Sequence, residues 1–131
     1  MRDQERRVLL WFMPATLLLT ALAFGAADGT WLKKVPAKDR ERKNPYEGRT
    51  DAVAAGRLVY EEHCSKCHGE NAEGTNKRPS LKSTRVQREA TEGDLHWLLV
   101  NGNMGRGMPS WSKLGDPQIW QVISYLRSLS Q

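Results

Sequence analysis

The sequence predicts an all-α domain of about three to five short helices. Apolar residues recur every three or four positions in two segments of the second half, whereas no segment alternates as a half-buried β-strand would. Two sets of apolar residues share this helical spacing: Leu95, Leu98 and Leu99, then Ile119, Val122, Ile123 and Leu126. Gly and Pro are scattered between these segments, which predicts short helices joined by ordered loops.

An uncharged run of 20 residues, 8–27, lies close to the N-terminus. A helix of about 20 residues spans the hydrocarbon core of a bilayer, and Trp11 and Trp31 lie near the two ends of this run, where aromatic rings favour the interface. We therefore expect residues 1–7 to be cytoplasmic and residues 8–27 to be a transmembrane anchor. The alternative is an uncleaved or cleaved signal peptide, although the run is longer than the usual apolar core of about 7 to 15 residues.

Charge divides the rest of the chain into two regions. Residues 28–47 are expected to form a polar basic tether, because six Lys or Arg face two acidic residues between Lys33 and Lys43. Residues 48–131 are expected to form the folded domain, with 11 basic and nine acidic residues. Such a balance argues against the broad basic face of a nucleic-acid-binding domain.

A second basic stretch contains no acidic residue between Glu73 and Glu89. Its basic members are Lys77, Arg78, Lys82, Arg85 and Arg88. Such a stretch is either a docking patch for an acidic partner or a solvated loop.

The first helix of the domain is expected to start at Thr50 or Asp51 as the N-cap and to run toward Cys64. Residues 69–90 show no sustained periodicity. We therefore expect a long loop after the first helix.

Capping signals also bound the two later helices. Thr91 and Asp94 have the spacing of a capping box, and the helix that follows is expected to end before Gly102. Asp116 is expected to be the N-cap of the last helix, with Pro117 at its first helical position.

The only two cysteines, Cys64 and Cys67, are followed directly by His68. C-x-x-C-H is the attachment signature of a c-type haem, in which the thiols bond the haem covalently and the histidine binds its iron. A zinc site would need about four ligands, and the only other histidines are His63 and His96. A thioredoxin-like pair would need a βαβ setting, and a disulfide across so short a loop would stabilise little. The motif therefore predicts one covalent haem c.

Three stretches resemble the class I, single-haem cytochrome c family over about residues 48–130. Residues 56–60 (GRLVY) followed by residues 64–69 (CSKCHG) look like its first helix and haem-binding turn. Residues 107–111 (GMPSW) look like its sixth-ligand loop, and residues 116–127 (DPQIWQVISYLR) look like its final helix.

The resemblance implies roles for individual residues. Met108 would bind the iron opposite His68, and Gly56 would allow the first and last helices to cross closely. The carbonyl of Pro79 would orient the imidazole, and Leu81 would cover the haem ring.

The methionines can also be compared without the resemblance. A neutral thioether paired with histidine raises the reduction potential of a haem. Met1 and Met13 lie before or within the apolar run, so Met104 and Met108 remain. Pro109 restrains the backbone next to Met108 and favours this methionine, while Met104 and His96 stay open as alternatives.

Trp97 and Trp111 are expected to line the haem pocket or to pack in the core, and the same alternatives apply to Trp120.

The resemblance implies one-electron transfer between Fe(II) and Fe(III) rather than an enzymatic reaction. We expect a single-pass protein of the cytoplasmic (inner) membrane with its haem domain on the periplasmic side. It would be a tethered carrier or a cytochrome subunit of a respiratory or photosynthetic complex, with redox proteins as its partners. The alternative is a haem enzyme or gas sensor with a displaceable sixth ligand, such as a small peroxidase.

Overall fold

Helices and short helical turns build the part of the chain that the computed structural model describes, residues 29–130. The α-helices are α1 (Ala37–Arg40), α2 (Thr50–His63), α3 (Ser65–His68), α4 (Glu92–Asn101) and α5 (Gly115–Ser128). Four short turns complete the list: η1 (Thr30–Lys34), η2 (Arg85–Glu89), η3 (Met104–Arg106) and η4 (Ser112–Leu114). Within residues 29–130 the β-structure is limited to one isolated bridge, between Asn103 and Met108. The all-α prediction is confirmed for this region.

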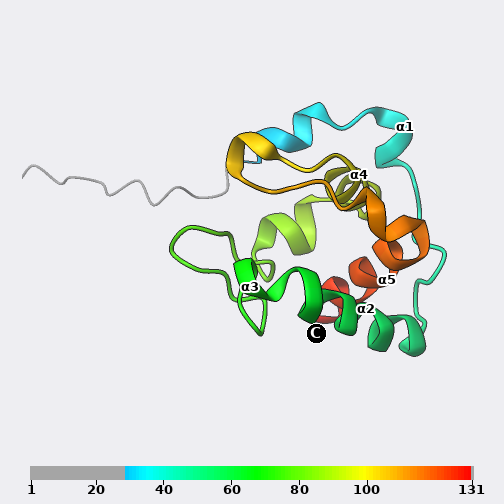
Figure 1. The fold of residues 1–131 in the computed structure, drawn as a ribbon. Coiled ribbons are helices and arrows are strands. Elements are labelled where there is room, and N and C mark those ends of the chain that lie inside the picture. The colour runs from blue at the N-terminus through cyan, green and yellow to red at the C-terminus, as the bar shows by residue number, and fades with distance from the viewer. Residues whose placement is uncertain (1–28, 131) are drawn as a thin grey trace, which may run out of the picture.

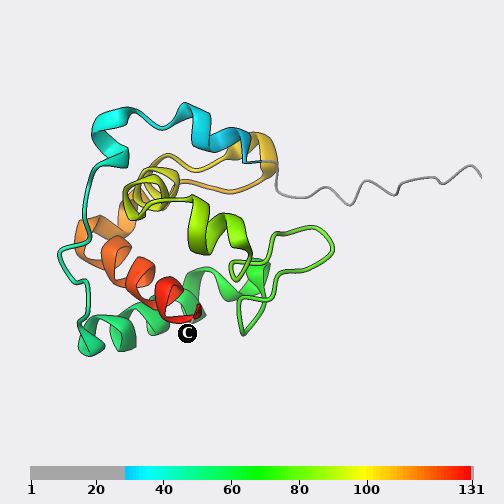
Figure 2. The same cartoon turned by 180° about the vertical axis from the view of Figure 1, so that it is seen from behind.

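Helix α5 is the centre of the packing. It contacts α2 on one side and α4 on the other, and α1 lies against α4 (Figures 1 and 2). Where α2 crosses α5, a methyl group added to Gly56 would lie 1.9 Å from the backbone oxygen of Gln121. Only glycine permits this close approach, as the sequence resemblance implied.

The core follows the predicted apolar faces. The four residues that predicted the apolar face of α5, namely Ile119, Val122, Ile123 and Leu126, are all buried. Leu95 and Leu99 of α4 are buried as well, and Leu98 packs against them from a half-buried position. Burial of these faces supplies the main favourable free energy of folding.

The capping box of α4 is confirmed. The backbone N–H of Asp94 donates to Thr91 Oγ1 at 3.0 Å, and the N–H of Thr91 donates to Asp94 Oδ2 at 2.8 Å. Both bonds satisfy donors that a helix start would otherwise leave unpaired. The helix ends at Asn101, directly before Gly102 as predicted.

The starts of α2 and α5 differ from the expectation. Helix α2 begins at Thr50 itself, and no side chain caps it. Helix α5 begins at Gly115, so Asp116 lies within the first turn and makes no capping bond. Its carboxylate instead accepts hydrogen bonds from Arg42 and His96, because these distant groups compete with the helix end for the same oxygens.

Residues 29–47, which belong to the expected polar tether, lie against the helices and contribute to the core. Trp31 and Val35 are buried, and the side-chain amide of Asn44 donates to the backbone oxygen of Trp120 and to Ser124 Oγ. At Gly93 the absence of a side chain allows α1 to approach α4 closely, since a methyl group there would lie 2.0 Å from the backbone oxygen of Asp39. The average composition of this segment is polar because lysines and arginines surround Trp31 and Val35. Composition alone therefore does not predict that these two residues are buried.

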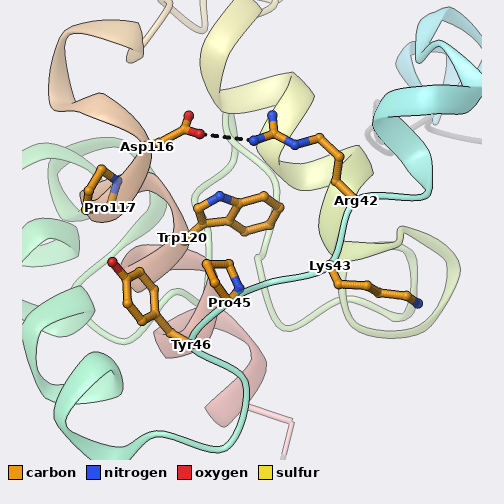
Figure 3. Close-up of a pocket in the computed structure, with 7 residues that line it drawn as sticks. All are labelled: Arg42, Lys43, Pro45, Tyr46, Asp116, Pro117 and Trp120. Carbon is orange, nitrogen blue, oxygen red and sulfur yellow. Dashed lines mark hydrogen bonds and ion pairs between the residues drawn. The ribbon is translucent and has the colours of Figure 1, made fainter.

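Arg42, His96 and Asp116 form a closed cluster beside Trp120 (Figure 3 shows the Arg42–Asp116 pair). Each of the three contacts between these side chains measures 3.0 Å, and the His96 ring stacks on Trp120 at 4.2 Å. A guanidinium can only donate, so Nδ1 of His96 accepts and Nε2–H donates to Asp116. Both ring nitrogens are therefore engaged, which leaves neither for an iron.

The cluster predicts a pH dependence of stability. Burial lowers the pKa of His96, and the positive charge of Arg42 lowers this pKa further, against the opposing effect of Asp116. The unfolded chain therefore binds the proton more readily, so the stability is fully present above about pH 6.5 and is lost as the pH falls through the lowered pKa. We expect His96→Asn to reduce the difference between urea midpoints measured at about pH 8 and about pH 5. An unchanged difference in this variant would contradict the prediction.

None of the helices in residues 29–130 has the length and apolar character needed to cross a bilayer. The predicted anchor, residues 8–27, lies outside the described residues.

Candidate functional site

The site begins where α2 ends. The N–H groups of Cys67 and His68 donate to the carbonyl of Cys64 at 3.1 and 3.0 Å, which forms the single turn α3. This turn brings both free thiols and the imidazole into one short segment. Burial, with a smaller effect of the Cys67 thiol, raises the pKa of Cys64 to about 11.

His68 has a defined orientation and tautomer. Its Nδ1 lies 2.9 Å from the carbonyl oxygen of Pro79, which can only accept, so Nδ1 carries the proton and Nε2 keeps its lone pair. Burial lowers the pKa of His68, which favours the neutral imidazole that a metal requires. The hydrogen bond is the one that the sequence resemblance implied between these two residues.

The loop that carries Pro79 is fastened to the haem-motif turn by backbone bonds. Gly74 N–H donates to the His68 carbonyl at 2.7 Å, and Leu81 N–H donates to the Ala72 carbonyl at 2.9 Å. Ala72 is in the left-handed region, with φ of 60°, and is fully buried. Pro79 itself is exposed, and Leu81 packs against the core.

Met108 lies at the end of a tight loop that starts at Asn103. The N–H of Asn103 donates to the Met108 carbonyl at 2.8 Å, and the N–H of Met108 donates to the Asn103 carbonyl at 3.1 Å. Met108 is half-buried and packs against the core, whereas Met104, in the same loop, is 72% exposed. Of the two methionines, Met108 is therefore the one whose side chain packs against the core.

The tryptophans divide into two groups. Trp97 and Trp111 are half-buried against the core, and the N–H of Trp111 ties the loop after Met108 to the Leu99 carbonyl at 2.8 Å. The ring of Trp111 also lies 5.4 Å from that of His63. Trp120 is buried and its ring contacts His96 and Arg42 instead.

The loops of His68 and Met108 lie on the same side of the molecule, at the left in Figure 1 and at the right in Figure 2. An imidazole lone pair, a thioether and two free thiols are the donor set of a c-type haem, and the tautomer of His68 matches iron ligation. Within residues 29–130 no three or more His, Cys, Asp or Glu side chains gather in a way that could hold a bare metal ion. The residues fit haem c.

The cysteine motif and Met108 were predicted from the sequence, but two long-range features of the structure were not. The first is the Arg42–His96–Asp116 cluster, whose members are 20 to 74 residues apart. The second is the side chain of Arg78, which donates to the carbonyl of Arg106 at 2.8 Å, 28 residues away. The only sequence signal for the second is the position of Arg78 directly before Pro79.

Comparison with known proteins agrees with this geometry. The family model described as "Cytochrome C oxidase, cbb3-type, subunit III" matches residues 51–126. The "Cbb3-type cytochrome c oxidase subunit CcoP" of Azospirillum brasilense is 37% identical over 89 residues, which cover 61% of this chain and 30% of that protein. "Cytochrome c550" of Pseudomonas aeruginosa is 30% identical over 143 residues, covering 98% of this chain and 96% of that protein. The chain thus spans under a third of the length of the CcoP relative.

Two solved structures share the fold. Cytochrome CL of Methylophaga aminisulfidivorans superposes with a TM-score of 0.55 and 24% identity, over 66% of this chain and 58% of that chain. The c-type cytochrome XoxG of Methylobacterium extorquens gives a TM-score of 0.51 and 20% identity, over 60% of this chain and 50% of that chain. At these identities the likeness concerns the fold alone. Together with the family match, it identifies the chain as a member of the class I, single-haem cytochrome c family, which transfers single electrons through a covalently bound haem c.

Proposed function

We propose that this chain is a membrane-tethered electron carrier, or an electron-transfer subunit of a membrane complex, and not an enzyme. Its haem would be attached through Cys64 and Cys67, with His68 and Met108 as the axial ligands. Two observations carry the proposal: the Nε2 lone pair of His68 is free for a metal, and Met108 is half-buried against the core while Met104 is exposed.

The residues of the chain hold and shield the haem, which itself supplies the reversible exchange between Fe(II) and Fe(III) when bound. The carbonyl of Pro79 keeps the proton of His68 on Nδ1 and so orients the ring. The bridge between Asn103 and Met108 fixes the backbone from which the thioether extends. Leu81, Trp97 and Trp111 supply half-buried apolar surface that would exclude water from the haem pocket.

The carrier and the enzyme or sensor alternative make different predictions for carbon monoxide. If His68 and Met108 fill both axial positions, no position is open to an added ligand, and His96 has no free nitrogen to act as a distal base. We expect the visible spectrum of the dithionite-reduced protein to stay unchanged under carbon monoxide. Rapid formation of a carbon monoxide adduct, together with peroxide turnover, would favour the enzyme or sensor.

The proposed membrane attachment rests on the 20 uncharged residues 8–27. Relatives named as subunits of cbb3-type oxidases support a partner in a membrane electron-transfer complex, and attachment beside such a partner would raise the effective concentration of the haem domain. The proposed location is the cytoplasmic membrane, with the haem domain in the periplasm.

Fractionation of bacteria that express the full chain and mature c-type cytochromes tests this location. We expect the haem-staining polypeptide in the membrane fraction, resistant to carbonate and released by detergent. Protease added to spheroplasts is expected to digest the haem domain, because that domain lies outside the cytoplasmic membrane. A shorter haem-staining product in the soluble periplasmic fraction would show instead that residues 8–27 act as a cleaved signal.

A further inference from the structure

Arg78 joins the two loops that carry the proposed axial ligands. Its Nη1 donates to the carbonyl oxygen of Arg106 at 2.8 Å, within the loop that ends at Met108. The adjacent Gly107 lies against the same guanidinium, since a methyl group there would be 3.0 Å from Nη2. The side chain therefore crosses from the loop that orients His68 to the loop that presents Met108.

The backbone of Arg78 is held firmly on the His68 side. Its N–H donates to Thr75 Oγ1 at 3.1 Å, and its carbonyl accepts the N–H of Thr75 at 2.9 Å. Pro79 follows directly and restricts the residue before it to extended conformations. The next carbonyl, that of Pro79, accepts the hydrogen bond from His68 Nδ1–H. A shift of the Arg78 backbone would thus also move the group that orients His68.

The Met108 loop lies at the surface, with residues 104–107 exposed. Its backbone bonds are local: the pair between Asn103 and Met108, and the N–H groups of Arg106 and Gly107, which donate to the carbonyls of Asn103 and Met104. Gly107 has φ of 75°, a conformation that glycine adopts without strain. A charged donor bound to a carbonyl in this loop would restrict its opening, because such bonds are stronger than neutral ones.

We propose that Arg78 is a positioning residue that holds the Met108 loop closed over the haem and, through its fixed positive charge, favours the Fe(II) state. The inference rests on the proposed ligation by His68 and Met108. The guanidinium stays charged at all physiological pH values and donates through a planar fork, whereas lysine supplies the charge without the fork. Arg78→Lys and Arg78→Gln therefore separate the loop contact from the charge.

The experiment uses the full-length haem-loaded protein in detergent. The thioether-to-iron charge-transfer band of the oxidised protein reports ligation by methionine, and its loss on mild heating is followed beside far-ultraviolet circular dichroism. Both Arg78 variants are expected to raise the equilibrium constant for loss of this band about tenfold before the helices unfold, as expected for a lost charge-assisted hydrogen bond. Arg78→Gln alone is expected to lower the equilibrium constant for reduction severalfold, where tenfold corresponds to about 59 mV for one electron.

Lys77→Gln is the matched control. It removes a neighbouring positive charge from a side chain that forms no hydrogen bond or ion pair within the described part of the chain. We expect the band of this variant to be lost at the wild-type temperature. Equal effects of Lys77→Gln and Arg78→Gln on both readouts would overturn the proposal, because a general charge effect would then explain them.

The outcomes distinguish a failure of the proposed role of Arg78 from a failure of the proposed ligation by Met108. A wild-type protein with the band, and Arg78 variants with unchanged band loss, would overturn the role of Arg78 while the ligation stands. A wild-type protein without the band would overturn ligation by Met108, and the role of Arg78 with it.

Discussion

Met108→Ala is expected to abolish the thioether-to-iron charge-transfer band of the oxidised protein and to lower the reduction potential by on the order of 0.1 V. Thioether ligation stabilises Fe(II) relative to Fe(III), and a weaker or harder replacement ligand, such as water, removes this preference. Met108 packs against the core at the end of a loop closed by backbone bonds, whereas Met104 in the same loop is exposed. Absorption spectroscopy and potentiometric titration measure both effects.

Met104→Ala is the matched control for this prediction. Met104 belongs to the same loop and is 72% exposed, so its removal is expected to leave both the band and the potential at their wild-type values. The reverse pattern, with the band lost in Met104→Ala and kept in Met108→Ala, would exchange the roles of the two methionines. Retention of the band in both variants would show that neither residue alone provides the ligand.

The sequence was sufficient for the parts of the site that depend on local spacing. Cys64, Cys67 and His68 lie within one turn, and Met108 is restrained by the proline that follows it. The capping box at Thr91 is local as well, because its two bonds join residues three positions apart. Such features need no knowledge of the tertiary fold, and the structure has the turn and the capping box where the spacing predicted, while ligation by Met108 stays a prediction.

Features that depend on long-range packing could not be found in this way. Aspartate favours the N-cap position on local grounds, and this preference predicted Asp116 as the cap. In the structure its carboxylate instead binds Arg42, which lies 74 positions away in the sequence. In the same way, the polar composition of residues 28–47 predicted a tether, while two apolar residues within it, Trp31 and Val35, are buried against the helices. A few buried side chains decide where a segment lies, even when its average composition is polar.

Gly56→Ala is expected to have the largest effect on folding. The added methyl group would lie 1.9 Å from the Gln121 oxygen, 2.4 Å from the Gln121 carbonyl carbon and 2.9 Å from the Val122 nitrogen. All three are backbone atoms of α5, so no side chain can rotate away, and α2 and α5 must separate. We expect a loss of about 3 kcal/mol or more in the free energy of unfolding, at the upper end of overpacking effects, measured by urea denaturation of the haem-loaded protein.

Gly105→Ala tests whether this loss comes from the helix crossing rather than from the exchange of glycine for alanine. A methyl group on Gly105 meets no atom within 4 Å, and the residue lies in the exposed turn η3. Its free energy of unfolding is therefore expected to stay within about 0.5 kcal/mol of the wild type. Alanine has a higher helix propensity than glycine by about 1 kcal/mol, so propensity alone would make Gly56→Ala more stable. A stabilised Gly56→Ala protein would thus contradict the close crossing of α2 and α5, in which an added methyl group lies 1.9 Å from the Gln121 oxygen.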